Sequence, residues 1–451
     1  MLSFAARGEL PAMTTDLASP ARARGLPLRP APAHPPPFAL TAAHFLTALL
    51  WLGAAALGLI VVAPLLARGA FLDPHVLAVV HCVTLGVITT TIFGALYQML
   101  PPLLGVTVRS VRAAALELGF LVAGTLVLVT GLWHARPAWQ GAGWLLVAGA
   151  IGCASWTLLP QRRRATQGKL TGLYISAGHS ALGLAFLLAG ARIGEGLGWW
   201  HVDRLGAIAA HFHLAALGFA TLTAVGVSSR LLPMFLAPDD APEWPLRWIG
   251  PVAGAGLLVF AAGELAGSRA ATVSGAALLA LAMAGYLALA ATWFRRRTRP
   301  LDPALGFMAA AFVGLAASVA IGLALLQAGA GAAFARAVTA YAVMAVLGWL
   351  VLLILGVYYR VIPFLVWINL GGASAAGRDP AGLMPRRAAW ASLAVIAGGV
   401  WLLAAAIRAG SATAAQAGAG AFAIGVLGVI VQYVRLVVIV RRTARGRAAE
   451  R

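Results

Sequence analysis

Long apolar segments separated by short polar loops dominate the pattern of this chain. Each apolar segment is long enough, at about 1.5 Å per helical residue, to cross a hydrocarbon core of roughly 30 Å. Alanine and leucine prevail in these segments, and apolar and polar positions do not alternate with a period of two, so strands are not expected. Twelve such segments are predicted as transmembrane helices, at about residues 40–66, 75–104, 113–133, 143–160, 171–191, 205–236, 248–267, 271–293, 303–328, 337–367, 388–407 and 413–434.

Composition supports the same class. Hydrophobic residues make up 61% of the chain and charged residues only 10%, which is too little polar surface for a soluble protein of this size. We therefore predict an all-α integral membrane protein in three parts: a disordered cytoplasmic tail at 1–37, a membrane domain at 38–441 and a basic cytoplasmic tail at 442–451. Cys82 and Cys153 lie in different predicted helices, so a disulfide framework is not indicated.

The basic residues are distributed unevenly between the two ends of the predicted helices. Of the 33 lysines and arginines, 26 fall in the N-terminal tail, the even-numbered loops and the C-terminal tail, and 7 fall in the odd-numbered loops. This asymmetry predicts that both termini are cytoplasmic, in a multi-pass protein of a bacterial-type inner (plasma) membrane. The net charge of +20 is therefore interpreted as a topology signal beside anionic lipid, and a nucleic-acid partner is not expected.

One phrase occurs three times along the chain. Its copies are HCVTLGVITTTIFGALYQMLP at 81–101, HFHLAALGFATLTAVGVSSRLLP at 211–233 and YAVMAVLGWLVLLILGVYYRVIP at 341–363. When the copies are anchored on Gly86, Gly218 and Gly348, each has a second glycine eight residues later and a proline fifteen residues later. The anchors lie 132 and 130 residues apart, and so regular a period indicates three copies of one structural unit. We predict three four-helix repeats, at about 38–160, 171–293 and 303–434.

Five of the nine histidines lie inside predicted helices. An ionisable group in hydrocarbon is costly, so each of the five is a candidate for function: His44, His81, His179, His211 and His213. The position five residues before the anchor is His81 in the first phrase and His213 in the second, but valine in the third. Because residues two apart on a helix point to nearly opposite sides, His211 and His213 are predicted to face two different centres.

The predicted topology also gives approximate depths. His81, His211 and His213 are expected in the outer third of the membrane, and His44 and His179 nearer the middle or the cytoplasmic half. The segments LTAAHFLTAL and ISAGHSALGL make His44 and His179 apparent equivalents in the first two repeats. Alternatives stay open here: each histidine either binds a cofactor or hydrogen-bonds a neighbouring helix, and the repeated glycines either allow close helix packing or make room for a flat macrocycle.

The three phrases resemble subunit I of the haem–copper oxidase superfamily, especially the cbb3-type oxidases and the related nitric oxide reductases. HFHLAALGF at 211–219 is similar to the family's HxHxxALGW motif, in which two histidines ligate two haems on opposite helix faces, and GVYYRVIPF at 356–364 is similar to its G-x-YY-x-x-P ending. The resemblance implies twelve helices in three four-helix arcs about a pseudo-threefold axis. It also implies haem b, with His81, His211 and His213 as candidate ligands of haem iron or copper, and a cytochrome or quinol electron donor on another chain.

The chain departs from this family at several positions. Its HxH pair lies in the sixth predicted helix instead of the tenth, where Tyr341 and Val343 stand. The seventh helix, WIGPVAGAGLLVFAAGELAG, lacks the two adjacent histidines that complete the family's copper site. Carboxylates inside helices are scarce, and the main ones, Glu117 and Glu264, lie near helix ends, which disfavours a proton pump.

We therefore expect a haem-binding membrane protein that acts in electron transfer or binds NO or O2, rather than a complete proton-pumping oxidase. If it is an enzyme, the resemblance implies an oxidoreductase of the cytochrome oxidase or nitric oxide reductase type, and its catalytic residues are left open. One alternative is a copper-binding or copper-transporting protein, for which His81, Cys82, His211 and His213 supply nitrogen and sulfur ligands. Another is a cofactor-free assembly or structural subunit. His44 and His179 complete the set of candidate cofactor-binding residues.

Overall fold

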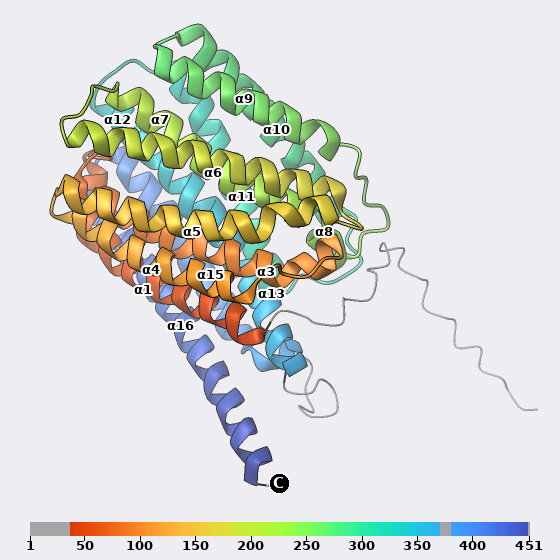
Figure 1. The fold of residues 1–451 in the computed structure, drawn as a ribbon. Helices are drawn as coiled ribbons and strands as arrows, with labels where there is room; N and C mark the ends of the chain where they lie inside the picture. The colour runs from red at the N-terminus through yellow and green to blue at the C-terminus, as the bar shows by residue number, and fades with distance from the viewer. Residues whose placement is uncertain (1–36, 370–379, 450–451) are drawn as a thin grey trace, which may run out of the picture.

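The computed structural model describes residues 37–369 and 380–449 (Figure 1). Within them, twelve helical spans are long and apolar enough to cross a membrane, which confirms the predicted all-α membrane class. The unbroken spans are α1 (Phe38–Ala67), α4 (Val111–Trp133), α5 (Pro137–Arg164), α6 (Lys169–Gly196), α9 (Leu246–Ala266), α10 (Arg269–Arg295), α11 (Pro303–Leu325), α15 (Arg386–Ala409) and α16 (Ala412–Ala449). The tail predicted at 1–37 lies, except for its last residue, outside the described residues. Helix α16 continues to Ala449, through most of the predicted basic tail.

Three spans change helix type in their interior. They are α2 (Pro74–His81) with η1 (Cys82–Thr89) and α3 (Thr90–Leu104); α7 (Arg204–His213) with η2 (Leu214–Thr221) and α8 (Leu222–Leu236); and α12 (Ala332–Val343) with η3 (Met344–Val351) and α13 (Leu352–Asn369). Each η segment is a π-helix of eight residues that holds the anchor glycine of one repeated phrase. Two threonine hydroxyls have the same five-residue spacing as the π-helix. Thr89 donates to the carbonyl of Thr84, and Thr221 donates to the carbonyl of Ala216. The three phrases therefore share one local structure. A short 3-10 helix, η4 (Pro380–Leu383), precedes α15.

Side-chain caps explain where several of these helices begin. Asp73, Ser110, Asp203, Ser268 and Asp302 each accept a hydrogen bond from a backbone N–H in the first turn of the following helix. Such caps satisfy amide groups that have no partner within the helix. Asp73 and Asp203 precede α2 and α7, so the spans that carry His81 and His213 begin in the same way.

The same helices pack together in each of the three predicted repeats. The first helix lies against the π segment of its own repeat, as α1 does with η1, α6 with η2 and α11 with η3. The third helix packs extensively on the fourth, as in α4–α5, α9–α10 and α15–α16. The arrangement of the three units about a pseudo-threefold axis stays a prediction.

The repeated glycines lie where the second span of a repeat meets its first helix. At five of these six positions an added Cβ atom would overlap a side chain of the facing helix. The contacts are Gly86 with Trp51 and Gly94 with His44 of α1, Gly218 with Ala181 and Gly226 with Tyr174 of α6, and Gly356 with Met308 of α11. Of the two interpretations of these glycines, the structure favours close helix packing over space for a macrocycle.

These contacts also fix which residues of the first helices correspond. His44 and Tyr174 each face the second glycine of their phrase, so they occupy equivalent places. Each also reaches the third helix of its repeat: His44 Nε2 lies 3.0 Å from Glu117 Oε2, and the Tyr174 hydroxyl donates to the Leu246 carbonyl at 2.6 Å. The predicted equivalence of His44 and His179 is therefore wrong, because two similar apolar strings do not determine helix register.

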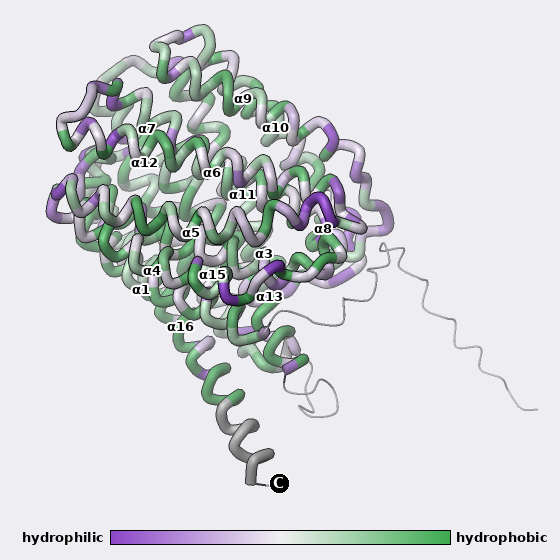
Figure 2. The backbone as a smooth tube through the Cα atoms, in the orientation of Figure 1, coloured by the Kyte–Doolittle hydropathy of each residue, from purple (hydrophilic) through white to green (hydrophobic). Residues whose placement is uncertain are grey.

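The three spans that contain a π segment form the centre of the bundle. Buried residues make up 67% of the α2–α3 window, 56% of the α7–α8 window and 83% of the α12–α13 window, against 50% or less in the other spans. The central spans also bond one another: the hydroxyls of Thr91 and Tyr358 lie 2.7 Å apart, and Trp349 Nε1 donates to Thr221 Oγ1 at 3.0 Å. Figure 2 shows hydrophilic residues gathered at helix ends and loops, with apolar residues along the helices between them.

Candidate cofactor site

His81 and His213 make the same local hydrogen bond at the same place in their phrases. His213 ends α7 and its Nδ1 donates to the Ala209 carbonyl at 2.8 Å, while His81 ends α2 and its Nδ1 donates to the Leu77 carbonyl at 2.7 Å. A carbonyl only accepts, so the proton lies on Nδ1, and Nε2 of a neutral ring carries the lone pair. A hydrogen bond from the other ring nitrogen commonly orients metal-binding histidines. Both rings therefore have a tautomer that suits a metal at Nε2.

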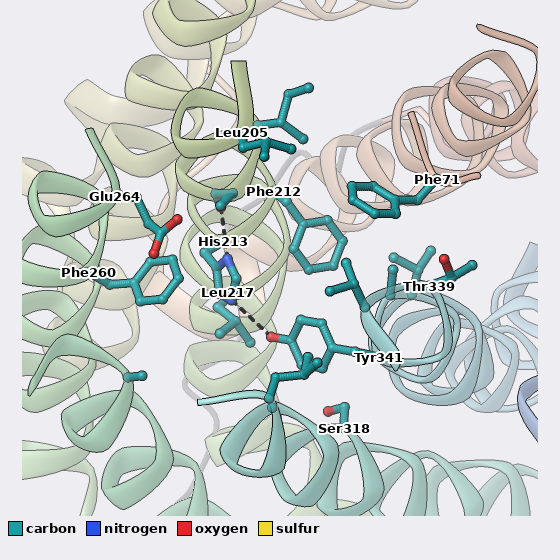
Figure 3. A pocket seen from close by; sticks show the side chains of 18 of the residues that line it. Phe71, Leu205, Phe212, His213, Leu217, Phe260, Glu264, Ser318, Thr339 and Tyr341 are labelled. Carbon is teal, nitrogen blue, oxygen red and sulfur yellow. Dashed lines mark hydrogen bonds between the residues drawn. The ribbon is translucent and has the colours of Figure 1, made fainter. Parts of the chain in front are cut away.

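His213 lines a cavity of about 790 Å³ in the half of the bundle that contains the end of α1 and the starts of α2, α7 and α12. Figure 3 shows Phe212, His213 and Phe260 at this cavity, with the Tyr341 hydroxyl pointing to the His213 ring. That hydroxyl donates to His213 Nε2 at 3.1 Å, and the centroids of the Phe260 and His213 rings lie 4.2 Å apart. Cavities of about 300–1,000 Å³ with apolar walls and few polar groups are typical small-molecule and cofactor sites.

His81 and His211 face each other from neighbouring spans. Their ring centroids lie 6.4 Å apart with an angle of 28° between the planes, and His211 Nδ1 donates to the Ala185 carbonyl of α6 at 2.8 Å. Within the described part of the chain, neither Nε2 has a hydrogen-bond partner. The two rings therefore lie near each other, each with its Nδ1 fixed by a carbonyl.

His211 and His213 point to different neighbours, as residues two apart on a helix should. His211 contacts α6 and His81, whereas His213 contacts Phe260 and Tyr341. In the structure His81 is opposite His211, and His213 is opposite Tyr341.

The mixed copper site that the sequence suggested is not assembled. Among the described residues, no group of three or more His, Cys, Asp or Glu side chains could hold one metal ion. Cys82 is buried just after His81, but it does not complete such a group with His211 and His213. A copper ion would therefore rely on the two imidazoles of His81 and His211.

The remaining two candidates, His44 and His179, lie apart from this site. Both ring nitrogens of His44 are occupied, Nδ1 by the Leu40 carbonyl at 2.8 Å and Nε2 by Glu117, so His44 has no nitrogen free for a cofactor. His179 is buried beside Phe93 and Phe219, with ring centroids 5.7 Å and 6.3 Å away. Neither of its nitrogens has a partner in the described structure.

Two residues matter more in the structure than the sequence indicated. Tyr341 occupies the position in the third phrase that His211 occupies in the second. Alignment of the phrases could therefore have predicted that Tyr341 faces a histidine. Glu117 was placed near a helix end, where solvation is ordinary, but its side chain is fully buried against His44. The partner of Glu117 lies 73 residues away, a contact that no local pattern reveals.

No known family model matches this chain, and no curated protein matches it.

Proposed function

We propose that this chain is a haem-binding membrane protein related to cytochrome oxidase subunit I, acting in electron transfer or in the binding of NO or O2. The observation that carries the proposal is the cavity of about 790 Å³ lined by His213, whose Nδ1 is fixed by a carbonyl and whose Nε2 faces Tyr341. A neutral imidazole is a common axial ligand of haem iron and adds no buried charge.

The residues around His213 have separable tasks in this proposal. His213 would supply a nitrogen ligand to the haem iron, and the Ala209 carbonyl holds its ring in place. Phe212 and Phe260 give apolar walls beside it. Tyr341 holds Nε2 by one neutral hydrogen bond, which metal coordination would displace. A bound haem would supply a reversible one-electron centre or a coordination position for a diatomic gas.

A second centre, of haem iron or copper, is proposed at His81 and His211. It is supported by the ring separation of 6.4 Å and by the two carbonyl-fixed Nδ1 atoms. Two neutral nitrogen ligands suit either metal. The electron donor is proposed to be a cytochrome or quinol on another chain, with the protein in a bacterial-type plasma membrane and both termini cytoplasmic.

Optical spectra of the detergent-purified protein test this proposal. We expect a sharp reduced Soret and α band after dithionite, and a shift on adding CO if one coordination position is open. His213→Ala should abolish or shift the band, whereas the control His134→Ala, at an exposed position, should leave it unchanged. A colourless protein from haem-replete cells would overturn the haem proposal. Copper bound to the wild type and lost in His81→Ala would then support the copper alternative.

A further inference from the structure

A second polar cluster is buried near the opposite end of α1 from the cavity. It consists of His44 of α1, Tyr97 of α3 and Glu117 of α4, and the side chains of His44 and Glu117 are fully buried. His44 lies 15 residues before Leu59, the first α1 residue at the cavity, which is about 22 Å along the helix. The cluster is therefore separate from the candidate cofactor site.

The hydrogen bonds of His44 determine how many protons this cluster holds. Its Nδ1 donates to the Leu40 carbonyl, so Nδ1 carries a proton. The contact of 3.0 Å between Nε2 and Glu117 Oε2 requires one further proton between these atoms. That proton lies either on the imidazole, giving an ion pair, or on the carboxyl group, giving two neutral groups. In both forms the pair has no net charge, which permits its burial among apolar helices.

Two polar atoms beside the pair have no partner except each other. Glu117 Oε1 and the Tyr97 hydroxyl are both buried, and neither makes a hydrogen bond to any other described residue. The Tyr97 hydroxyl and the Glu117 carboxyl group are close enough to interact, and the rings of His44 and Tyr97 meet edge to face at 5.5 Å. An unsatisfied buried polar group is costly, so the Tyr97 hydroxyl is expected to hydrogen-bond the Glu117 carboxyl group directly.

We propose that His44, Glu117 and Tyr97 form a proton-binding site, in which the Tyr97 hydroxyl hydrogen-bonds the Glu117 carboxyl group. A proton arriving at Glu117 Oε1 binds there while the shared proton moves onto His44 Nε2. The site then consists of an imidazolium and a carboxylic acid and has gained one positive charge. Release of the proton restores the neutral pair, so the step needs no other reactant.

A second polar pair lies one turn nearer the start of α1. Thr41 donates to the Gln98 side chain at 3.0 Å, and Gln98 is only half-buried. The start of α1 is the end that the basic loops predict to be cytoplasmic. The only other titratable group in electrostatic contact with the cluster, among the residues described, is the Cys153 thiol of α5.

Infrared difference spectra recorded between pH values, in H2O and in D2O, test this site on the purified protein. The wild type should show a carboxylic acid C=O band that changes with pH and shifts in D2O. Glu117→Gln should lose this band, and the control Glu243→Gln, in the loop before α9, should keep it. If the pH-dependent band is absent from the wild type, or persists in Glu117→Gln, Glu117 is a fixed partner of His44 and the proposal is wrong.

Tyr97→Phe tests the part that Tyr97 plays in the site and removes only a hydroxyl. It should keep the carboxyl band but move its frequency, because one hydrogen bond to the carboxyl group is lost. An unchanged frequency would exclude Tyr97 from the site. None of these spectra needs haem or copper, so the test does not depend on the proposed function.

Discussion

At the scale of single residues, the histidines inside the spans differ in what their ring nitrogens contact. His81 and His213 each use Nδ1 for a carbonyl of their own helix. His44 uses both nitrogens, and His179 uses neither. In the sequence, all of these histidines are equally good candidates for function, because an ionisable group in hydrocarbon is costly at each position. Only the contacts separate candidate ligands from a buried pair.

The pair of His44 and Glu117 should show strong energetic coupling. His44→Leu leaves a buried carboxyl without its partner, and such losses cost about 3–5 kcal/mol. The double variant His44→Leu with Glu117→Leu removes both polar groups and should lose less stability than the sum of the single variants. Reversible unfolding in detergent measures the three values. Additive losses would show that the two groups do not interact.

His179 should behave in the opposite way. Because neither ring nitrogen has a partner in the described structure, His179→Phe removes an unsatisfied polar group and keeps a ring beside Phe93 and Phe219. The variant should unfold within about 1 kcal/mol of the wild type, or at a higher temperature. A loss of several kcal/mol, measured in the same unfolding assay, would show that His179 binds something in the native protein.

At the scale of helices, the π segments and the glycines place the site. A π segment follows His81, His213 and Val343, and π-bulges within α-helices are often found at functional sites. The sequence predicted the position of each phrase but not this wider winding. In an apolar segment the sequence does not distinguish an α-helix, with bonds four residues back, from a π-helix, with bonds five residues back. The threonine bonds to carbonyls five residues back are seen only in the folded helix.

The packing of the helices predicts opposite effects for two glycines that are each helical. Gly226→Ala should destabilise the protein by about 1–3 kcal/mol, because the new methyl group would overlap Tyr174 of α6. Gly183→Ala in α6 has open space around the added methyl group, so it should be neutral or stabilise the helix by up to about 1 kcal/mol. Thermal unfolding in detergent compares the two. Equal effects would contradict the close contact of α6 with α8.

At the scale of the whole molecule, hydropathy alone located all twelve spans. The window at 75–104 and the helices from Pro74 to Leu104 agree almost residue for residue, because bilayer thickness and helix rise leave little freedom. The sequence did not predict which side chains the candidate residues contact. Tyr341 lies 128 residues from His213, and Glu117 lies 73 residues from His44, so their meeting depends on how the spans pack. The candidate ligands were predictable, but their pairing was not.

The predicted orientation of the bundle can be tested with two single cysteines in a Cys82→Ser, Cys153→Ser background. His201→Cys lies in the exposed loop before α7, beside Asp203 at the rim of the cavity, and Arg163→Cys lies at the exposed end of α5. Because basic residues favour the cytoplasmic side, a membrane-impermeant maleimide should label only His201→Cys in intact cells, and both after permeabilisation. Labelling of Arg163→Cys alone would invert the orientation. The cavity at His213 would then face the cytoplasm, and the cluster at His44 would lie toward the outer face.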